Sequence, residues 1–403
     1  MSTSLLYQAF GVKGYEYQAT RYWSGQVVFE IVRPRDELRC SVCGSTGVIG
    51  RGTVSRRWRG VPIGKKPVWL SLDVQRVECF ECDVVRQVHL GFADPKVHHT
   101  KAFARYALEL SRHMTIQDVA RHLGVTWDTI KEIQKEHLER RFKKPRLRGL
   151  KQLAIDEICV GHGQRYLTVV LDLVSGAVVF VGHGKGMEAL EPFWRRLRAS
   201  RAKIRAVAID MGPAYIAAVQ KHLPKATIVF DHFHVIKLFN EKLSDLRRSL
   251  YHEATMQQKK VLKGSRWLLL KNPENLDRKK NEKKRLQEAL KLNEPLALAY
   301  YLKEDLRRLW SQPGKRKAGV FLTDWCRRAG ASDIPMLVKF AATLRTHRRG
   351  ILAWYDYRIS TGPLEGTNNK IKTMQRQAYG FRDMEFFKLK IYALHEARYE
   401  LVG

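Results

Sequence analysis

The sequence predicts an α/β protein in which a domain built on a mixed β-sheet follows two small amino-terminal modules. Three observations indicate this fold class. Two Cys-x-x-Cys pairs lie in the first 82 residues, a pair of helices joined by a glycine turn spans 115–139, and strand-like and helix-like segments alternate over 153–231. With 403 residues, 44% of them hydrophobic, the chain can form about two to four domains with proper cores.

The chain is strongly basic: 73 Lys and Arg against 40 Asp and Glu give a formal net charge of +33. Such an excess favours a polyanionic partner, first a nucleic acid and second an anionic membrane surface. Apolar runs such as 177–181 and 296–302 are too short to span a bilayer, and the amino-terminal residues lack the pattern of a secretory signal. We therefore expect an intracellular protein that binds nucleic acid and no membrane.

The first module, residues 1–95, is predicted to hold a structural Zn²⁺ ion. Its ligands would come from the pairs CSVC and CFEC, which are Cys40, Cys43, Cys79 and Cys82. Two such pairs complete a four-thiolate site, and the strand-like residues 44–78 between them predict a hairpin or small sheet. Disulfides are the alternative, which an intracellular location disfavours, and a redox pair would not explain two copies. The remaining cysteines, Cys159 and Cys326, are expected to be buried apolar residues.

The second module, residues 96–145, is predicted to be a helix-turn-helix. Ala120, Gly124 and Ile130 have the spacing of a small contact residue, a turn glycine and an apolar residue of the second helix. Two threonines are placed to cap the helices, Thr115 and Thr126. The residues expected to read DNA lie near the start of the second helix: Trp127, Asp128, Thr129 and Lys131. An ordinary helical hairpin is the alternative, but the adjacent zinc module and the basic run 141–149 favour DNA.

The third region contains three adjacent strand-like runs, then a helix, a strand, a helix and a strand. The strand-like runs are 153–160, 165–174, 177–182, 204–211 and 226–231. This order is that of a ribonuclease-H-like mixed sheet. In that fold the first and fourth strands are neighbours, so acids on these two strands can meet.

Two such acids are Asp156, in the first strand, and Asp210, at the end of the fourth. Carboxylates on a rigid sheet bind Mg²⁺ or Mn²⁺, and two such ions stabilise the attacking and leaving oxygens of phosphodiester chemistry. Glu365, in the stretch STGPLEGTNNKIK, is predicted to be the third ligand, delivered by a helix packed on the sheet. The alternative is an acid in the first turn of a surface helix that Thr361 caps.

Other acids compete for this role. Glu157 is expected to face the opposite side of the strand, and Asp172 is interpreted as a solvated edge residue. Asp231 and His234, in the sequence FDHFHV, could position the scissile phosphate or a nucleophile. Their alternative is a helix cap and a satisfied core histidine.

Taken in order, these motifs resemble bacterial insertion-sequence transposases of the ISL-three family over nearly the whole chain. The resemblance is carried by the cysteine pairs, the helix-turn-helix, AIDEI, AIDM, DHFHV, GPLEGTNNKIK and QAYGFRDMEFF. It implies a DDE triad of Asp156, Asp210 and Glu365 on a ribonuclease-H-like fold. It also implies a bacterial, cytoplasmic and nucleoid-associated protein, and relates the DxxH of Asp231 and His234 to Mutator-type elements.

The resemblance further implies a catalytic domain of residues 150–239 and 351–403, interrupted by a helical insertion domain at 240–350. Helical apolar spacing and a basic surface in that region agree with this. The insertion is expected to bind DNA ends or make dimer contacts, with a solvated spacer as the alternative. The basic residues expected to hold the DNA backbone beside Glu365 are Lys370, Lys372 and Arg376, although a generic basic face would look the same.

The implied function is recognition of an element's terminal inverted repeats by a homodimer, followed by metal-dependent cleavage and strand transfer into target DNA. Two other classes remain open. A domesticated regulator would use only the two amino-terminal modules and would not need intact acids. A ribonuclease-H-like nuclease would need the acids but not the sequence-reading modules.

Overall fold

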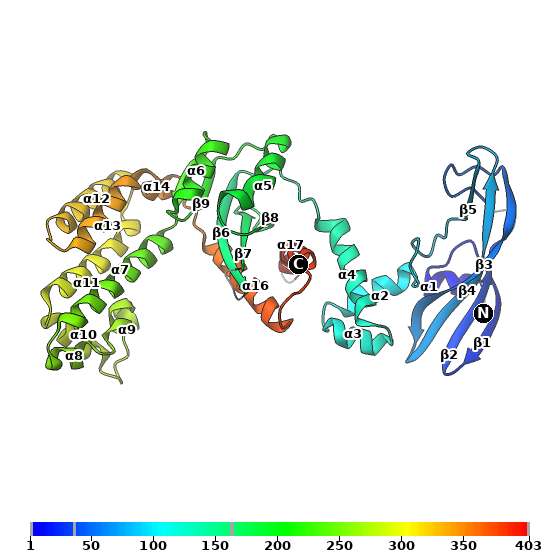
Figure 1. Cartoon of the computed structure of the whole chain (residues 1–403), viewed down its shortest axis with the longest axis horizontal. Helices are drawn as coiled ribbons and strands as arrows, with labels where there is room; N and C mark the ends of the chain where they lie inside the picture. Colours follow the sequence, from blue (N-terminus) through cyan, green and yellow to red (C-terminus); the bar gives the residue numbers. More distant parts are fainter. Residues whose placement is uncertain (1–2, 35–37, 162–164, 401–403) are drawn as a thin grey trace. The chain divides into compact units, whose positions relative to one another are not determined.

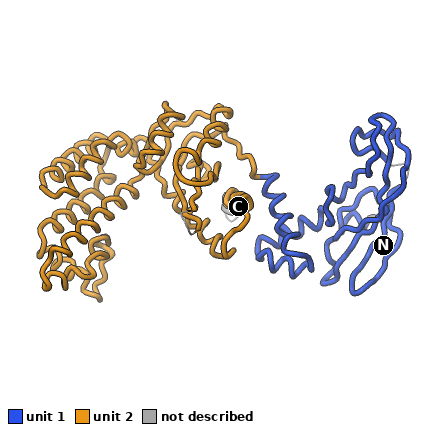
Figure 2. Tube along the Cα trace, in the orientation of Figure 1, with its two compact units in different colours: residues 1–141 blue, residues 142–403 orange. Residues whose placement is uncertain are grey.

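A computed structural model describes residues 3–34, 38–161 and 165–400, with side chains described as far as 394. The chain divides into two compact units, residues 1–141 and 142–403 (Figure 2). No helix within the described ranges is both long and apolar enough to cross a membrane.

The first unit begins with a five-stranded sheet (Figure 1). Its elements are α1 (Thr3–Phe10), β1 (Glu16–Trp23), β2 (Gln26–Val32), β3 (Val48–Ile63), β4 (Lys66–Cys79) and β5 (Val84–Gln87). The strands are ordered β1-β2-β4-β3, and β5 pairs with β4. Along β4 every second side chain is buried, from Val68 to Val74, as expected for a strand with one face on a core. The long β3–β4 pair confirms the predicted hairpin between the cysteine pairs.

Three helices follow the sheet along the chain: α2 (Lys101–Leu110), α3 (Ile116–Leu123) and α4 (Trp127–Phe142). Thr115 accepts a hydrogen bond from the Asp118 amide and Thr126 one from the Thr129 amide, so both expected caps are confirmed. Gly124 ends α3 with φ of +62°, a conformation that glycine adopts without strain. The predicted helix-turn-helix is therefore present.

A buried arginine, Arg59 on β3, connects the sheet to the helix-turn-helix. Its side chain is 4% exposed, and Nη2 donates to the carbonyl of Leu123 at 2.7 Å, at the end of α3. Nη1 donates to the carbonyl of Val68 at 3.3 Å, and the Arg59 carbonyl accepts from the Thr100 amide at 2.9 Å. The turn that precedes the expected reading helix is thus anchored on the zinc-module sheet.

We expect Arg59→Met to loosen this turn, because it leaves the buried Leu123 carbonyl without a donor at a cost of about 1–3 kcal/mol. Amide hydrogen exchange of the full-length protein should show faster exchange around Gly124. Arg57→Met is the matched control, since Arg57 lies exposed on the same strand. Equal exchange rates in both variants would contradict the anchoring role.

The second unit is built on a five-stranded mixed sheet. Its strands are β6 (Gln152–Gly161), β7 (Arg165–Asp172), β8 (Val178–His183), β9 (Ala206–Ile209) and β10 (Thr227–Phe230). They are ordered β10-β9-β6-β7-β8, with β6, β7 and β8 antiparallel and β6, β9 and β10 parallel. This order confirms the predicted fold class, with the first and fourth strands of this sheet as neighbours.

Helices cover both faces of this sheet. One face packs against α5 (Met187–Ser200) and α6 (Pro213–His222), in the core that contains Ile155 and Tyr215. The other packs against α16 (Gly362–Gln377) and α17 (Met384–Glu400), in the core that contains Ala154 and Leu364. Successive residues of β6 therefore point into different cores, which decides what each acid of this strand can contact.

The region inserted between β10 and α16 contains helices and no strand in the structure described (Figure 1). Its helices are α7 (His232–Glu253), α8 (Met256–Leu262), α9 (Ser265–Leu270), α10 (Glu282–Lys291), α11 (Glu294–Arg307), α12 (Lys315–Gly330), α13 (Pro335–Thr346), α14 (Arg348–Leu352) and α15 (Trp354–Tyr357), with 3-10 turns at Pro273–Asn275 and Arg308–Ser311. Helix α7 starts directly after β10 and continues into the insertion. There Phe239 packs edge-on against Trp325 and Phe340, so one hydrophobic core joins sheet and insertion.

Two local expectations are wrong. Asp172 is 7% exposed, because its carboxylate accepts hydrogen bonds from the Val174 and Ser175 amides and the Ser175 hydroxyl, which holds the β7–β8 turn. Cys159 is exposed, close to the end of β6, whereas Cys326 is buried as expected.

Candidate active site and zinc centre

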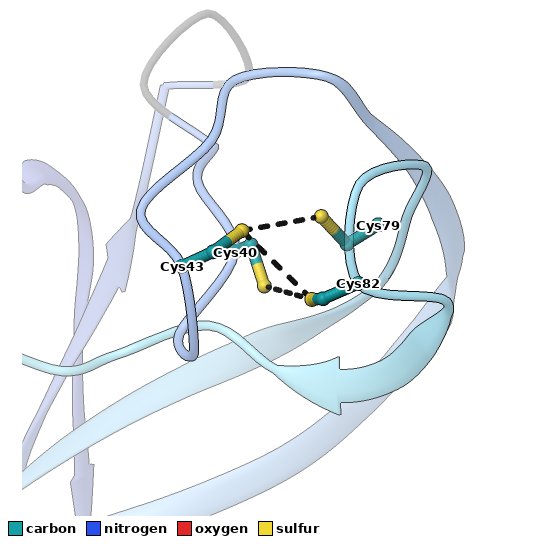
Figure 3. Close-up of side chains that lie close together, drawn as sticks. All are labelled: Cys40, Cys43, Cys79 and Cys82. Atoms are coloured by element: carbon teal, nitrogen blue, oxygen red, sulfur yellow. Dashed lines mark hydrogen bonds between the residues drawn. The ribbon is translucent and has the colours of Figure 1, made fainter.

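The four cysteines of the first unit converge from two turns (Figure 3). Cys40 and Cys43 precede β3, Cys79 ends β4, and Cys82 lies in the turn before β5. All four sulfur atoms lie within 4.8 Å of one another, with Sγ–Sγ distances of 3.6 Å (Cys40–Cys82), 3.5 Å (Cys43–Cys79) and 3.8 Å (Cys43–Cys82). A tetrahedral zinc ion with bonds of about 2.3 Å needs sulfur atoms about 3.8 Å apart. The cluster fits a structural zinc ion, and all four cysteines are free of disulfides.

The local backbone changes the pKa values of thiols in this cluster in a way that bears on cation binding. Hydrogen bonds from the backbone at Cys43 and Val42 lower the pKa of the Cys40 thiol to about 6. Burial and the neighbouring thiols raise the pKa of Cys82 well above its usual value. The backbone donors therefore favour a thiolate at Cys40, and zinc binding to thiols releases protons.

In the second unit, the strand register aligns three aspartates. Ala154 of β6 pairs with Ala208 of β9, and two residues further along each strand stand Asp156 and Asp210. Ile209 pairs with Phe230 of β10, so Asp231 follows in the same row. Because neighbouring strands lie about 4.8 Å apart, the register places these three residues in one row at the carboxyl ends of the parallel strands, on the same face of the sheet.

Asp156 is held by two hydrogen bonds. Its Oδ1 accepts from the Glu157 amide at 2.8 Å, and its Oδ2 accepts from Nδ2 of Asn368 on α16 at 3.0 Å. Burial, together with the negative charges of Asp210 and Glu157, raises the pKa of Asp156. The carboxylate is thus half-buried beside two other acids, and the charge of His234 offsets part of their effect.

The turn that follows Asp210 fixes the orientation of its side chain. Its Oδ1 accepts from the Gly212 amide at 2.9 Å, and a Cβ on Gly212 would lie only 2.8 Å from that oxygen. A glycine is therefore needed for the close approach. Glu157 points to the opposite core, as predicted, where its Oε1 accepts from the Tyr215 hydroxyl at 2.6 Å.

The third aspartate, Asp231, is 1% exposed and contacts two other segments. Its Oδ2 accepts from the Thr361 hydroxyl at 2.6 Å and lies 3.1 Å from Nδ1 of His234. Asp231 and Thr361 both stand at helix N-caps, yet neither side chain makes a capping hydrogen bond. The interpretation of both residues as ordinary caps is wrong, since their side chains bond to each other and tie the start of α16 to the start of α7.

The charges in this cluster are coupled. Burial alone would raise the pKa of Asp231, but the hydrogen bonds from His234 and Thr361 outweigh it and hold that pKa below its usual value. The bond to Asp231 raises the pKa of His234, and the charges of Asp156 and Asp210 add to the effect. These contacts favour the protonated form of His234, against the opposing effect of its burial.

Glu365 lies exposed in the first turn of α16. Its carboxylate does not join a tight cluster with Asp156 and Asp210, because across 3–34, 38–161 and 165–400 the cysteines are the only set of three or more ligand groups within 4.8 Å. One turn later, Asn368 reaches Asp156, and its buried Oδ1 has no hydrogen-bond partner. Sequence reasoning missed Asn368, although its spacing of three from Glu365 places both on neighbouring faces of one helix.

Most of the residues expected to face DNA are exposed, whereas Thr129 and Lys131 are half-buried. At the start of α4, Trp127 is 43% exposed and lies 5.7 Å from Nζ of Lys131, while Asp128 is exposed and the Thr129 hydroxyl contacts that of Thr126 at 2.9 Å. On α16 the three basic residues are all exposed: Lys370, Lys372 and Arg376.

Comparisons with known proteins agree along the whole chain. Residues 153–391 match a family model described as transposase, of family ISL3, and residues 88–138 match the helix-turn-helix domain of transposase family ISL3. Residues 36–82 match the zinc-finger of transposase IS204/IS1001/IS1096/IS1165. The presence of a zinc-binding module and of a helix-turn-helix is thereby confirmed.

Among curated proteins, the transposase for insertion sequence element IS1001 of Bordetella parapertussis is 34% identical over 392 residues, 96% of this chain and 95% of that protein. The transposase for IS1557 of Mycobacterium tuberculosis is 30% identical over 399 residues, 92% and 89% of the two chains. Among solved structures, the Drosophila P element transposase strand transfer complex aligns with a TM-score of 0.34 and 13% identity, over 72% of this chain and 91% of that one. That similarity is too weak to support an argument. The family-model matches and the curated relatives show that this chain belongs to the ISL3 family of insertion-sequence transposases.

Proposed function

We propose that the protein binds the terminal inverted repeats of its element and catalyses metal-dependent cleavage and strand transfer, with Asp156, Asp210 and Glu365 as the catalytic acids. The observation that carries this proposal is the alignment of Asp156 and Asp210 on neighbouring parallel strands. Asn368 supports it, because its bond to Asp156 brings the helix that carries Glu365 onto the same face of the sheet.

The acids are suited to Mg²⁺ or Mn²⁺. Both ions take oxygen ligands, and Asp156 has a raised pKa because it is buried beside other carboxylates. The buried Oδ1 of Asn368, which has no partner, is a further oxygen beside them. We therefore assign Asp156, Asp210 and Glu365 as ligands. When bound, two such ions would stabilise the attacking and leaving oxygens of the phosphodiester.

We further propose that Asp231 and His234 assist the reaction by orienting the scissile phosphate, without binding the metal ions. Asp231 holds Nδ1 of His234 and leaves Nε2 to donate to a phosphate oxygen of the DNA. Thr361 ties this pair to the first turn of α16, which carries Glu365. The three residues would orient the scissile phosphate and the helix relative to the two aspartates.

Asp231→Asn is expected to slow cleavage by about ten- to hundred-fold, because the orientation and charge of His234 are lost while the shape of the side chain is kept. Single-turnover cleavage of a labelled element end measures this. Binding to the same end should stay unchanged. Thr361→Ser should retain activity, since it keeps the hydroxyl, whereas Thr361→Val should lose it. Full activity in both Asp231→Asn and Thr361→Val would contradict the proposal.

For DNA recognition, we propose that the helix-turn-helix reads the inverted repeat through the start of α4, near Trp127, Asp128, Thr129 and Lys131. The zinc module would support the helix-turn-helix in this role. Lys370, Lys372 and Arg376 would contact phosphates beside the acids, which adds affinity without sequence specificity. Two copies of the chain would pair two element ends before joining them to target DNA, on the bacterial chromosome in the cytoplasm.

The test is a cleavage and strand-transfer assay on labelled DNA that carries the element's own ends, with Mg²⁺ and without. We expect metal-dependent cutting at the ends, and joining of pre-cut ends to a target plasmid. A ribonuclease-H-like nuclease would cut but would not join pre-cut ends. A regulator without catalysis would bind the ends and leave them intact. Either of these results would overturn the proposal.

A further inference from the structure

A groove runs along α7 from the edge of the active site into the insertion. It has a volume of about 360 Å³. Its lining consists of one face of α7 and two residues of α9: Phe233, Ile236, Lys237, Asn240, Glu241, Ser244, Arg266 and Leu270. The α7 residues recur at helical spacing, so they form one continuous wall about three turns long.

The groove begins beside the proposed catalytic residues. Phe233 lies between His232 and His234 and packs against the His232 ring at a centroid distance of 4.1 Å. A Cβ built on Gly362 would lie 4.0 Å from Cε2 of Phe233, so the phenyl ring borders the first turn of α16. Glu365 is in that same turn. DNA that occupies the active site has this groove as an adjacent surface.

The lining combines an aromatic face, two cations, one carboxylate at Glu241 and a polar atom that lacks a partner. Phe233 is 55% exposed, and beside the groove Trp267 is 65% exposed, with the Arg266 guanidinium 5.0 Å from its ring centre. In the part of the chain that the structure describes, neither Lys237 nor Arg266 is paired with a carboxylate. Oδ1 of Asn240 is buried without a hydrogen-bond partner. These are the features of single-strand nucleic-acid sites: aromatic faces for bases and cations for the backbone.

We propose that this groove binds unpaired DNA next to the cleavage point, with Phe233 stacking on a base and Lys237 and Arg266 neutralising its phosphates. The inference rests on the proposed cleavage function, which brings a DNA end to Asp156 and Asp210. The volume is at the lower end of the roughly 300–1,000 Å³ of sites for small organic molecules, which suits a single base or nucleotide. Base faces are also available for stacking only where the strand is unpaired.

The test uses the full-length, zinc-loaded protein without Mg²⁺, so that binding is separated from chemistry. The probe is a duplex element end with a short single-stranded extension that carries 2-aminopurine, whose fluorescence falls on stacking. We expect quenching by the wild type and by Phe233→Trp. Phe233→Ala should lose the quenching and weaken binding of the extended end by about ten-fold or more. A blunt duplex of the same sequence should bind both proteins equally.

Tyr301→Ala is the matched control, because Tyr301 is a 62% exposed aromatic residue of the insertion outside this groove. It should keep the quenching. Lys237→Ala should lower the slope of log affinity against log salt by about 0.7, as expected for one phosphate contact to a single strand.

Unchanged quenching in Phe233→Ala, equal loss in Tyr301→Ala, or loss of blunt-duplex binding in Phe233→Ala would each overturn the assignment of the groove. These outcomes are distinct from failure of the proposed function. A wild-type protein that quenches the probe but never cuts DNA with Mg²⁺ would refute catalysis alone, and cutting without quenching would refute only the groove.

Discussion

Asp210→Asn is expected to abolish strand cleavage and strand transfer, with a loss of at least about a thousand-fold, while binding to the element's ends persists. The neighbouring strand carries Asp156 at the same register, and Asp156→Asn should have the same effect. Each substitution removes a charged oxygen from the proposed metal site and so weakens the stabilisation of charge in the transition state. In other enzymes, the loss of even a single group that stabilises such charge typically lowers the rate by about a hundred- to thousand-fold. Single-turnover cleavage of pre-bound ends measures the loss.

The stability of these variants separates chemistry from folding. Burial and nearby acids raise the pKa of Asp156, so ionising this carboxyl costs more free energy in the metal-free fold than in the unfolded chain. Asp156→Asn removes this repulsion, and its thermal midpoint without Mg²⁺ should equal or exceed that of the wild type. Asp245→Asn is the matched control, since Asp245 lies exposed on α7 in an ion pair with Arg248. Appreciable cleavage by Asp210→Asn, or an inactive Asp245→Asn, would contradict the assignment.

Loss of zinc is expected to have the second large effect, on DNA recognition. Cys79→Ser should leave the four-cysteine cluster incomplete. Structural zinc contributes about 10–16 kcal/mol in small zinc-binding peptides, which is as large as the total stability of a typical domain at about 5–15 kcal/mol. We expect the sheet of the first unit to unfold and specific binding to the element's ends to disappear. Zinc content, amide exchange over β3 and β4, and end binding measure this.

Cys159→Ser is the control for this substitution, because Cys159 is an exposed cysteine outside the cluster. It should retain one zinc ion per chain and full binding. Removal of zinc from the wild type with a chelator should reproduce the defect of Cys79→Ser, and added zinc should reverse it. Tight, specific binding by a zinc-free protein would show that the cluster does not support recognition.

The parts of the fold that local patterns specify could be predicted from the sequence. The cysteine pairs, the Gly124 turn and the alternation of strands and helices each depend on residues close together in the chain. The proximity of Asp156 and Asp210 could be predicted because the strand order of the mixed sheet makes their strands neighbours.

Contacts between distant segments could not be predicted. The bond between Thr361 and Asp231 joins residues 130 apart, and that between Arg59 and Leu123 joins residues 64 apart. In the first case, two residues with the position of helix caps use their side chains elsewhere. Thr361 and Asp231 have the position and chemistry of helix caps. Because they are buried between α7 and α16, their side chains bond to each other instead of to the backbone amides of their own helices.

The two burial errors have a similar origin. Asp172 follows an apolar strand, where an acid is usually solvated, yet the tight turn after it offers amide donors that permit burial. Cys159 continues an apolar strand pattern, but it sits close to the strand end and is exposed. Burial at strand ends depends on what the rest of the fold places over them, which periodicity does not specify.

We propose that Glu365 joins Asp156 and Asp210 as a ligand of the catalytic metal ions. The most direct test is the number of Mn²⁺ ions bound per chain, measured by electron paramagnetic resonance titration of the zinc-loaded protein on a pre-cut element end. The wild type should bind two Mn²⁺ ions, and Glu365→Gln should bind fewer or bind them at least about ten-fold more weakly. Two Mn²⁺ ions bound with unchanged affinity in Glu365→Gln would contradict the account.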